Sequence, residues 1–251
     1  MREHRIIILI CVATLFAIAI ISLDCGELAR IVQTSDADYV IMIDPGHGGM
    51  DGGASSSDGT LEKDINLAIA AKLAEMAEQY GCAAVMTRET DEWLCDTEEG
   101  SIRSRKTADL MARREMIRKY EPDLTVSIHL NSFKEDPSVR GAQVFYPSAG
   151  GSDVVLQQCS VLADTMQQVM NRELQPDKPR TAMTRDGVFI FKEVLSPVII
   201  VECGFMSNPE EAARLTTEKY QMELAQCIMA AIADFAQLEK PRTVEIIDSF
   251  R

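Results

Sequence analysis

The sequence predicts a single α/β domain, built on a mostly parallel, twisted sheet that is flanked by helices. Short apolar runs alternate with longer segments in which apolar residues recur every three or four positions. The run at 198–203 is nearly continuous and rich in β-branched residues, which is typical of a strand buried on both faces of a parallel sheet. The sequence shows no internal repeat or low-complexity tract, so we expect one hydrophobic core.

Each predicted strand is a compact apolar run bounded by turn residues. In chain order these runs are 39–43, 83–87, 124–130, 142–146 and 198–203. The first run stops at the turn Asp44-Pro45-Gly46, and a loop rich in Gly, Ser and Asp follows it. The third run follows Glu121-Pro122-Asp123, a sequence that ends the helix before it.

The predicted helices show apolar residues at helical spacing. In chain order they cover 62–80, 107–120, 152–171, a segment that begins at 208, and 217–238. The helix after 208 has the clearest start, because Asn208 can cap it and Pro209 suits its first position. Glu211, three residues beyond the cap, completes a capping box. Residues 46–59 and 89–105 show little periodicity and are expected to be loops.

The N-terminal segment differs in composition from the predicted domain. An apolar run from Ile6 to Leu23 follows Arg2 and Arg5, and it is long enough to cross a bilayer as a helix. A core helix would show a polar face, and this run shows none. We therefore expect a single-pass membrane anchor at 1–23, with a cleaved signal peptide as the alternative.

The charge bias around this anchor gives the expected location of the rest of the chain. Basic residues precede the apolar run, so the N-terminus is expected in the cytoplasm and the remainder outside the cell membrane. We expect a linker at 24–38, the folded domain at 39–239 and a C-terminal tail at 240–251.

The composition excludes some partners. The formal net charge is −14, from 39 acidic and 25 basic residues. An acidic surface repels phosphate backbones, which argues against a nucleic-acid partner. The seven cysteines include no C-x-x-C pair, so the sequence indicates neither a cysteine zinc site nor a redox dithiol.

Four polar residues stand where a parallel sheet would bring them together. His47 follows the first predicted strand, His129 ends the third, and Glu202 ends the last. Ligand sites in such sheets lie beyond the carboxyl ends of the strands, so we expect these three side chains at one edge of the sheet. Glu62 starts the helix that follows the glycine-rich loop carrying His47.

Two imidazoles and one carboxylate form the ligand set of a catalytic zinc, which keeps one further coordination position open. A second carboxylate, not on the metal, is then needed to move a proton from water to the leaving group. Each residue alone has a simpler explanation, because a His after a strand is more often a turn or core residue and Glu62 suits the first turn of a helix. Glu202 is different, since burying an unpaired carboxylate is costly. The spacing of these residues alone does not decide between a zinc site and these separate structural roles.

Four ordered motifs surround these residues. In chain order they are Ile43-Asp44-Pro45-Gly46-His47-Gly48-Gly49 with Asp51-Gly52-Gly53-Ala54, then Thr87-Arg88, then Ser127-Ile128-His129-Leu130-Asn131, and finally Val201-Glu202-Cys203-Gly204-Phe205-Met206-Ser207-Asn208. Together they resemble the zinc N-acetylmuramoyl-L-alanine amidases of the amidase-3 type, over nearly the whole predicted domain. The resemblance implies zinc (Zn²⁺) as the cofactor and His47, Glu62 and His129 as its ligands. It also implies that Glu202 is the catalytic residue.

The resemblance implies an enzyme that cleaves the amide bond between the lactyl group of muramic acid and the L-alanine of peptidoglycan stem peptides. The short chain, the N-terminal anchor and the absence of wall-binding repeats are similar to a sporulation subgroup of that family. In that subgroup, stem peptides are removed from spore-cortex glycan before muramic-δ-lactam forms, and the domain would face the forespore intermembrane space. Some relatives need a lipoprotein partner to hold metal, so a lipoprotein activator is one candidate partner besides peptidoglycan.

Other protein classes could have the same ligand set or the same fold. A zinc-dependent glycan deacetylase or peptidase would use a similar ligand set, and a catalytically silent wall-binding module would keep the same fold. Asp44 and Asn131 are candidates to orient the ligands, although Asp44 could instead cap the turn that follows it. The chain departs from the family pattern in a longer acidic excursion around 98–100, and in lacking an Ala-Asn pair within 113–117.

Overall fold

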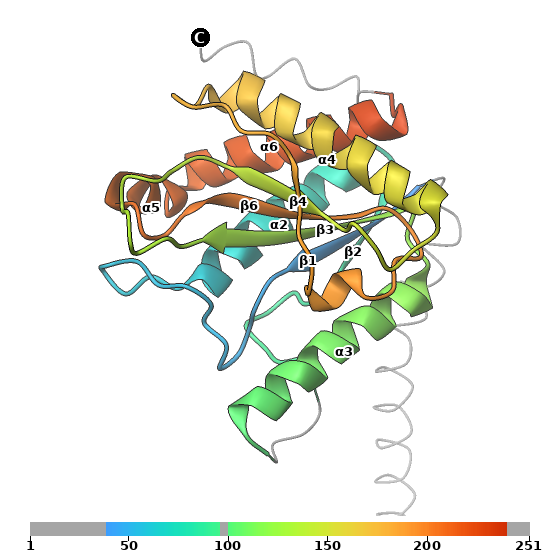
Figure 1. Ribbon diagram of the computed structural model, residues 1–251, viewed down its shortest axis with the longest axis horizontal. Helices are drawn as coiled ribbons and strands as arrows, with labels where there is room; N and C mark the ends of the chain where they lie inside the picture. Colours follow the sequence, from blue (N-terminus) through green and yellow to red (C-terminus); the bar gives the residue numbers. More distant parts are fainter. Residues whose placement is uncertain (1–38, 96–99, 240–251) are drawn as a thin grey trace, which may run out of the picture. The chain divides into compact units, whose positions relative to one another are not determined.

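A single mixed sheet runs through the part of the chain that the structure describes (Figure 1). The computed structural model describes residues 39–95 and 100–239. In chain order the strands are β1 (Val40–Pro45), β2 (Ala83–Met86), β3 (Leu124–Asn131), β4 (Gln143–Tyr146), β5 (Met183–Thr184) and β6 (Val198–Phe205). Their order across the sheet is β2-β1-β3-β6-β4-β5.

The strand directions confirm part of the predicted topology. Strands β2, β1, β3 and β6 run parallel to one another, whereas β4 is antiparallel to β6 and pairs in parallel with β5. The expectation of a mostly parallel sheet is therefore corrected to a mixed sheet with a parallel core. A parallel return needs a crossover, usually a helix, and residues 132–142, which join β3 to β4 and are all described, contain none.

The helices agree with the predicted positions, with small differences at their ends. They are α2 (Glu62–Gln79), α3 (Ile102–Tyr120), α4 (Asp153–Leu174), α5 (Pro209–Leu215) and α6 (Glu218–Ala236), with one 3₁₀ turn, η1 (Phe189–Phe191), among the described residues. Helix α3 begins earlier than expected because Ser101 caps it by accepting a hydrogen bond from the backbone N–H of Ser104. The sequence does not predict β5 or η1, because elements of two and three residues show no periodicity.

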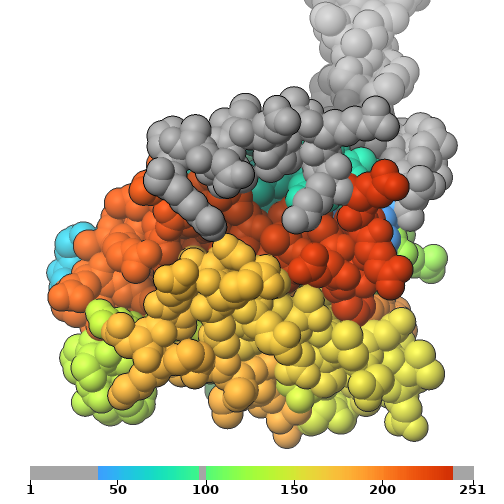
Figure 2. All heavy atoms as spheres, turned by 90° about the horizontal axis from the view of Figure 1, so that it is seen from above, coloured from blue at the N-terminus to red at the C-terminus, as the bar shows by residue number. Residues whose placement is uncertain are grey.

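One face of the sheet forms the hydrophobic core. Helix α6 packs against both α2 and α4, and these helices cover that face. In Figure 2 the atoms of α4 (yellow) and α6 (orange to red) form much of the outer surface on this side. The strands contribute buried side chains that include Ile41, Ile43, Val126, Ile128, Ile199 and Val201. The apolar runs that predict the strands therefore predict this core.

The opposite face of the sheet carries polar residues near the carboxyl ends of its parallel strands. Side chains alternate between the two faces along a strand. Asp44, Ser127, His129 and Glu202 therefore point away from the core. Asp44 lies in register with Ser127, and His129 lies in register with Glu202 on the neighbouring strand. Helix α3 lies on this side, across the sheet from α4 and α6 (Figure 1).

Several expectations concern residues that are not described. The predicted anchor at 1–23, the linker at 24–38, the tail at 240–251 and most of the acidic excursion lie outside the described residues. No helix in the described parts of the chain combines the length and apolar character needed to span a membrane. The described cysteines, which are Cys82, Cys95, Cys159, Cys203 and Cys227, are all free.

Candidate metal centre

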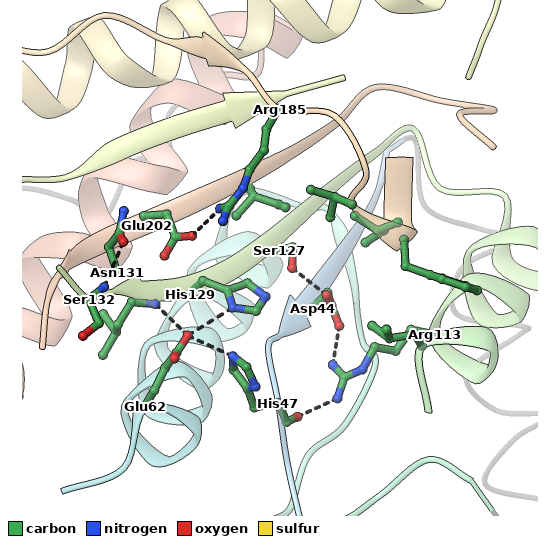
Figure 3. A pocket seen from close by; sticks show the side chains of 16 residues that line it. Asp44, His47, Glu62, Arg113, Ser127, His129, Asn131, Ser132, Arg185 and Glu202 are labelled. Atoms are coloured by element: carbon green, nitrogen blue, oxygen red, sulfur yellow. Dashed lines mark hydrogen bonds and ion pairs between the residues drawn. The ribbon is translucent and has the colours of Figure 1, made fainter. Parts of the chain in front are cut away.

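Three of the predicted site residues converge on one point (Figure 3). His47 follows β1, Glu62 is the first residue of α2, and His129 lies near the end of β3. Their potential ligand atoms all lie within 4.8 Å of one another. One oxygen of Glu62, Oε1, lies 3.2 Å from Nε2 of His47 and 3.1 Å from Nδ1 of His129. The sequence therefore predicts this cluster correctly as a spatial group.

Glu62 is held in place by backbone donors. Its Oε2 accepts the N–H of Ala54 at 2.7 Å, and its Oε1 accepts the N–H of Leu130 at 2.9 Å. Burial raises the pKa of this carboxyl, but the hydrogen bonds and charges of the two histidines outweigh burial and hold the pKa well below its usual range. Glu62 is therefore an anionic group at the centre of the cluster.

His47 has an unusual backbone conformation that is supported by arginines. Its φ of 64° lies in the left-handed region. Its carbonyl oxygen accepts hydrogen bonds from Nε of Arg88 at 2.8 Å and from Nη2 of Arg113 at 2.5 Å. Burial lowers the pKa of the imidazole, but hydrogen bonds with Asp51 and Glu62 more than compensate and raise it to about 9.

Glycines make room for the cluster. A Cβ atom on Gly46 would lie 2.2 Å from Cε1 of His129, and one on Gly53 would lie 2.5 Å from Oε2 of Glu62. Gly53 also has a positive φ of 68°, which favours glycine. The loop between β1 and α2 can approach the ligands only because these positions carry no side chain.

Asp44 and Asn131 were expected to orient the proposed ligands, but neither contacts their side chains. Asp44 instead accepts hydrogen bonds from Oγ1 of Thr87 at 2.7 Å, from Oγ of Ser127 at 2.6 Å and from Nη1 of Arg113 at 2.6 Å. Arg113 then binds the carbonyl of His47, so Asp44 acts through Arg113 on the loop that carries His47. The side chain of Asn131 lines the pocket, and its oxygen accepts the N–H of Ser132.

Glu202 lies in the same pocket, on β6. Its Oε1 accepts a hydrogen bond from Nη1 of Arg185 at 2.9 Å. Its Oε2 is buried and has no hydrogen-bond partner within the described part of the chain. The pocket has a volume of about 380 Å³, and its walls include all four predicted site residues together with Arg185. The carboxylate thus has one oxygen held by Arg185 and one without a partner among the described residues.

An apolar wall completes the pocket. Leu110 of α3 and the residues Val188, Phe189 and Ile190 around η1 also line the pocket. The guanidinium of Arg114 lies 5.2 Å from the ring centroid of Phe189, which ties this segment to α3. The pocket therefore combines a polar floor on the sheet with apolar contacts from α3 and η1.

Comparison with known proteins identifies the family. Residues 41–234 match the family described as N-acetylmuramoyl-L-alanine amidase. The chain belongs to the N-acetylmuramoyl-L-alanine amidase family. The matched region spans β1 to α6 and includes all four predicted site residues.

Relatives of this amidase family agree in sequence and in fold. The chain is 35% identical over 195 residues to the germination-specific N-acetylmuramoyl-L-alanine amidase of Bacillus subtilis, covering 77% of this chain and 78% of that protein. It superposes on the CwlD amidase from Clostridioides difficile, solved in complex with the GerS lipoprotein, with a TM-score of 0.75 and 36% identity over 80% of this chain and 99% of that chain. The amidase AmiC2 of Nostoc punctiforme gives a TM-score of 0.65 at 30% identity, over 79% and 97% of the two chains.

Two arginines of this amidase domain were not among the predicted site residues. Arg185 follows the two-residue strand β5, where no apolar run precedes it to mark a strand end. Arg113 lies in the middle of α3, and its main partner, Asp44, is 69 residues away in the sequence. A charged residue on the apolar stripe of a helix is the one local signal that could have indicated Arg113.

Proposed function

We propose that the chain is a zinc-dependent amidase that hydrolyses the bond between the lactyl group of muramic acid and the L-alanine of peptidoglycan stem peptides. The observation that carries this proposal is the convergence of His47, Glu62 and His129 in one pocket with Glu202. Membership of the amidase family supports the reaction class.

The donor set fits zinc. Two imidazoles and a carboxylate are the ligands that catalytic zinc commonly takes, leaving a coordination position open. The glycines at 46 and 53 leave the space that these side chains need to meet. His47, Glu62 and His129 would hold the ion, and zinc there would polarise the amide carbonyl and lower the pKa of water.

Glu202 is suited to the proton transfers that amide hydrolysis requires. Its unpaired Oε2 can accept a proton from the attacking water, while Arg185 keeps Oε1 in place. The same carboxyl can then deliver that proton to the leaving nitrogen, so that the L-alanine departs as an amine. The proton gained in the first step is the one lost in the second, and Glu202 returns to its starting state.

The biological setting is proposed from the relatives. The Bacillus subtilis relative is described as germination-specific, and the CwlD structure contains the GerS lipoprotein. These descriptions support a role in spore-cortex maturation, in which stem-peptide removal precedes formation of muramic-δ-lactam, and they support a lipoprotein partner. With the apolar N-terminal run, they also support a single-pass membrane location with the catalytic domain outside the cytoplasm, in the forespore intermembrane space.

The test is product analysis on peptidoglycan. The full-length chain is incubated with purified peptidoglycan, and the soluble products are identified by mass spectrometry. Free stem peptides with an unblocked L-alanine amine would support the proposal. Acetate release without free peptides would indicate a deacetylase, and neither product from a chain shown to hold zinc would indicate a wall-binding module.

A further inference from the structure

Helix α3 is attached to the rest of the domain largely through charged side chains. Its buried residues are Asp109, Arg113 and Ile117, so two of the three are ionisable. Nη1 of Arg113 binds Asp44 at 2.6 Å. About two turns closer to its N-terminus, α3 contacts the loop that carries His47, through Lys106. Its Nζ lies 2.6 Å from Oδ1 of Asp51, and its side chain is 45% exposed.

Asp51 links this lysine to a predicted metal ligand. Its other oxygen, Oδ2, lies 3.1 Å from Nδ1 of His47. The loop fixes Asp51, because its backbone N–H donates to the carbonyl of Gly48 and its carbonyl accepts the N–H of Gly48, both at 3.0 Å. Oδ1 also accepts the N–H of Gly53 at 3.3 Å. Asp51 is therefore a rigid acceptor with one oxygen for Lys106 and one for His47.

The two ring nitrogens of His47 thus have different surroundings. Nδ1 faces Asp51, whereas Nε2 faces Glu62 at 3.2 Å. Both neighbours are carboxylates and can only accept, so a metal ion held at Nε2 would leave the one remaining ring proton on Nδ1, where Asp51 accepts it. Among the described residues, His129 has no ion-pair partner other than Glu62. His47 is consequently the ligand whose orientation depends on a separate carboxylate.

We propose that Asp51 and Lys106 are positioning residues for the metal ligand His47, and that helix α3 thereby sets the affinity of the site for zinc. This inference rests on the proposed zinc site. Lys106 holds Oδ1, which leaves Oδ2 to His47 and keeps the acceptor oriented. Neither residue contacts the reacting atoms.

The direct test is the zinc affinity of the full-length chain, measured by competition with a chromogenic chelator. We expect Asp51→Asn to weaken zinc binding about 10- to 100-fold, as is usual when the partner of a metal-bound histidine is removed. Asp164→Asn, at an exposed site on α4, is the matched control and should bind zinc like the wild type. The melting temperature without metal is compared for each variant, so that a change of fold is distinguished from a change of site.

A double variant tests whether Lys106 orients the side chain at position 51, because the effects of the two substitutions on zinc affinity should then not add. An asparagine at 51 has one oxygen, which Lys106 and the N–H of Gly53 attract, so that its amide NH₂ faces Nδ1 of His47 and favours the wrong tautomer. Removing the ammonium in Asp51→Asn/Lys106→Met lets the amide turn its oxygen toward His47. We therefore expect the double variant to bind zinc more tightly than Asp51→Asn alone. A merely structural role would give additive or greater losses.

The outcomes separate this inference from the proposed function. A wild-type chain that does not bind zinc would overturn both. Two results would overturn this inference alone while the wild type binds zinc. One is a zinc affinity of Asp51→Asn within twofold of the wild-type affinity, and the other is a double variant that binds zinc no more tightly than Asp51→Asn.

If Asp51→Asn does not fold, the zinc affinity of Lys106→Met provides the test. We expect this substitution to weaken zinc binding about 2- to 5-fold, whereas Lys219→Met, an exposed control on α6, should leave it unchanged. Equal affinity in these two variants would overturn the inference.

Discussion

At the level of single residues, Glu202 is distinguished by the unequal surroundings of its two oxygens. Arg185 holds Oε1, and Oε2 is buried without a partner in the described part of the chain. A buried polar atom without a partner is costly, and a role in proton transfer would account for this one. In the proposed reaction this oxygen carries the proton between water and the leaving nitrogen.

Glu202→Gln should separate chemistry from metal binding. Glutamine keeps the volume and an acceptor for Arg185, but it cannot carry the proton. We expect turnover of peptidoglycan to fall about 10²- to 10⁴-fold, with zinc content and melting temperature near those of the wild type. Glu75→Gln, at an exposed site on α2, is the matched control. Retention of full activity would remove Glu202 from the mechanism.

Asp44 should make a measurable contribution to acid stability. Burial raises its pKa, but Arg113 and the hydroxyls of Ser127 and Thr87 outweigh burial and lower the pKa from 3.8 to about 2. A carboxyl with a lowered folded-state pKa stabilises the fold above its unfolded pKa and loses that contribution as the pH falls through the folded pKa. The shift corresponds to about 2 kcal/mol.

Comparison with Asp44→Asn would measure this contribution. The difference in unfolding free energy between the wild type and the variant should shrink by about 2 kcal/mol between pH 5 and pH 2. Urea unfolding at a series of pH values measures it. A difference that stays constant over this range would show that Asp44 is not the titrating group.

At the level of elements, the site depends on how closely the β1–α2 loop approaches β3. Gly46 has no space for a side chain, because an added Cβ would lie 2.2–2.6 Å from the imidazole atoms of His129. The loop and the strand are joined there by a hydrogen bond from the N–H of Gly46 to the carbonyl of Ile128, at 2.9 Å. The geometry of the proposed metal ligands is therefore set by backbone packing as well as by side chains.

Gly46→Ala should displace His129. We expect zinc binding to weaken on the order of 10- to 100-fold, as when the support of a ligand is lost, and the same competition assay measures it. Gly59→Ala is a control in the same loop, where an added Cβ meets no atom within 4 Å. Gly59→Ala should lower the stability of the fold only through the strain of its positive φ, and it should leave zinc affinity unchanged. Equal zinc affinity of the two variants would contradict this account of the loop.

The elements that carry the site are predictable to different degrees. The strands bearing His129 and Glu202 are long apolar runs, and their parallel arrangement brings these residues to one edge, so the sequence predicts both the strands and the meeting of the two side chains. Strand β5 has two residues, and the position of Arg185 depends on its pairing with β4. The antiparallel direction of β4 follows from the lack of a crossover helix between β3 and β4, and the sequence already indicates this lack, because no helix is predicted between 130 and 142. What the sequence alone does not predict is set by contacts between distant segments.

At the level of the whole molecule, the two faces of the sheet have separate roles. The face covered by α2, α4 and α6 holds the apolar core, and the face toward α3 holds the polar site. Because the core does not include the proposed ligands, the domain should stay folded without metal. Zinc should raise the melting temperature only through its binding free energy.

In the proposed mechanism, zinc held by His47, Glu62 and His129 is required for amide hydrolysis. The most direct measurement is stem-peptide release from peptidoglycan by the full-length chain, before metal removal with a chelator, after it, and after one equivalent of zinc is returned. We predict that release stops without metal while the fold persists, and that the returned zinc restores it. Undiminished release from protein shown to be free of metal would rule out a zinc-dependent reaction.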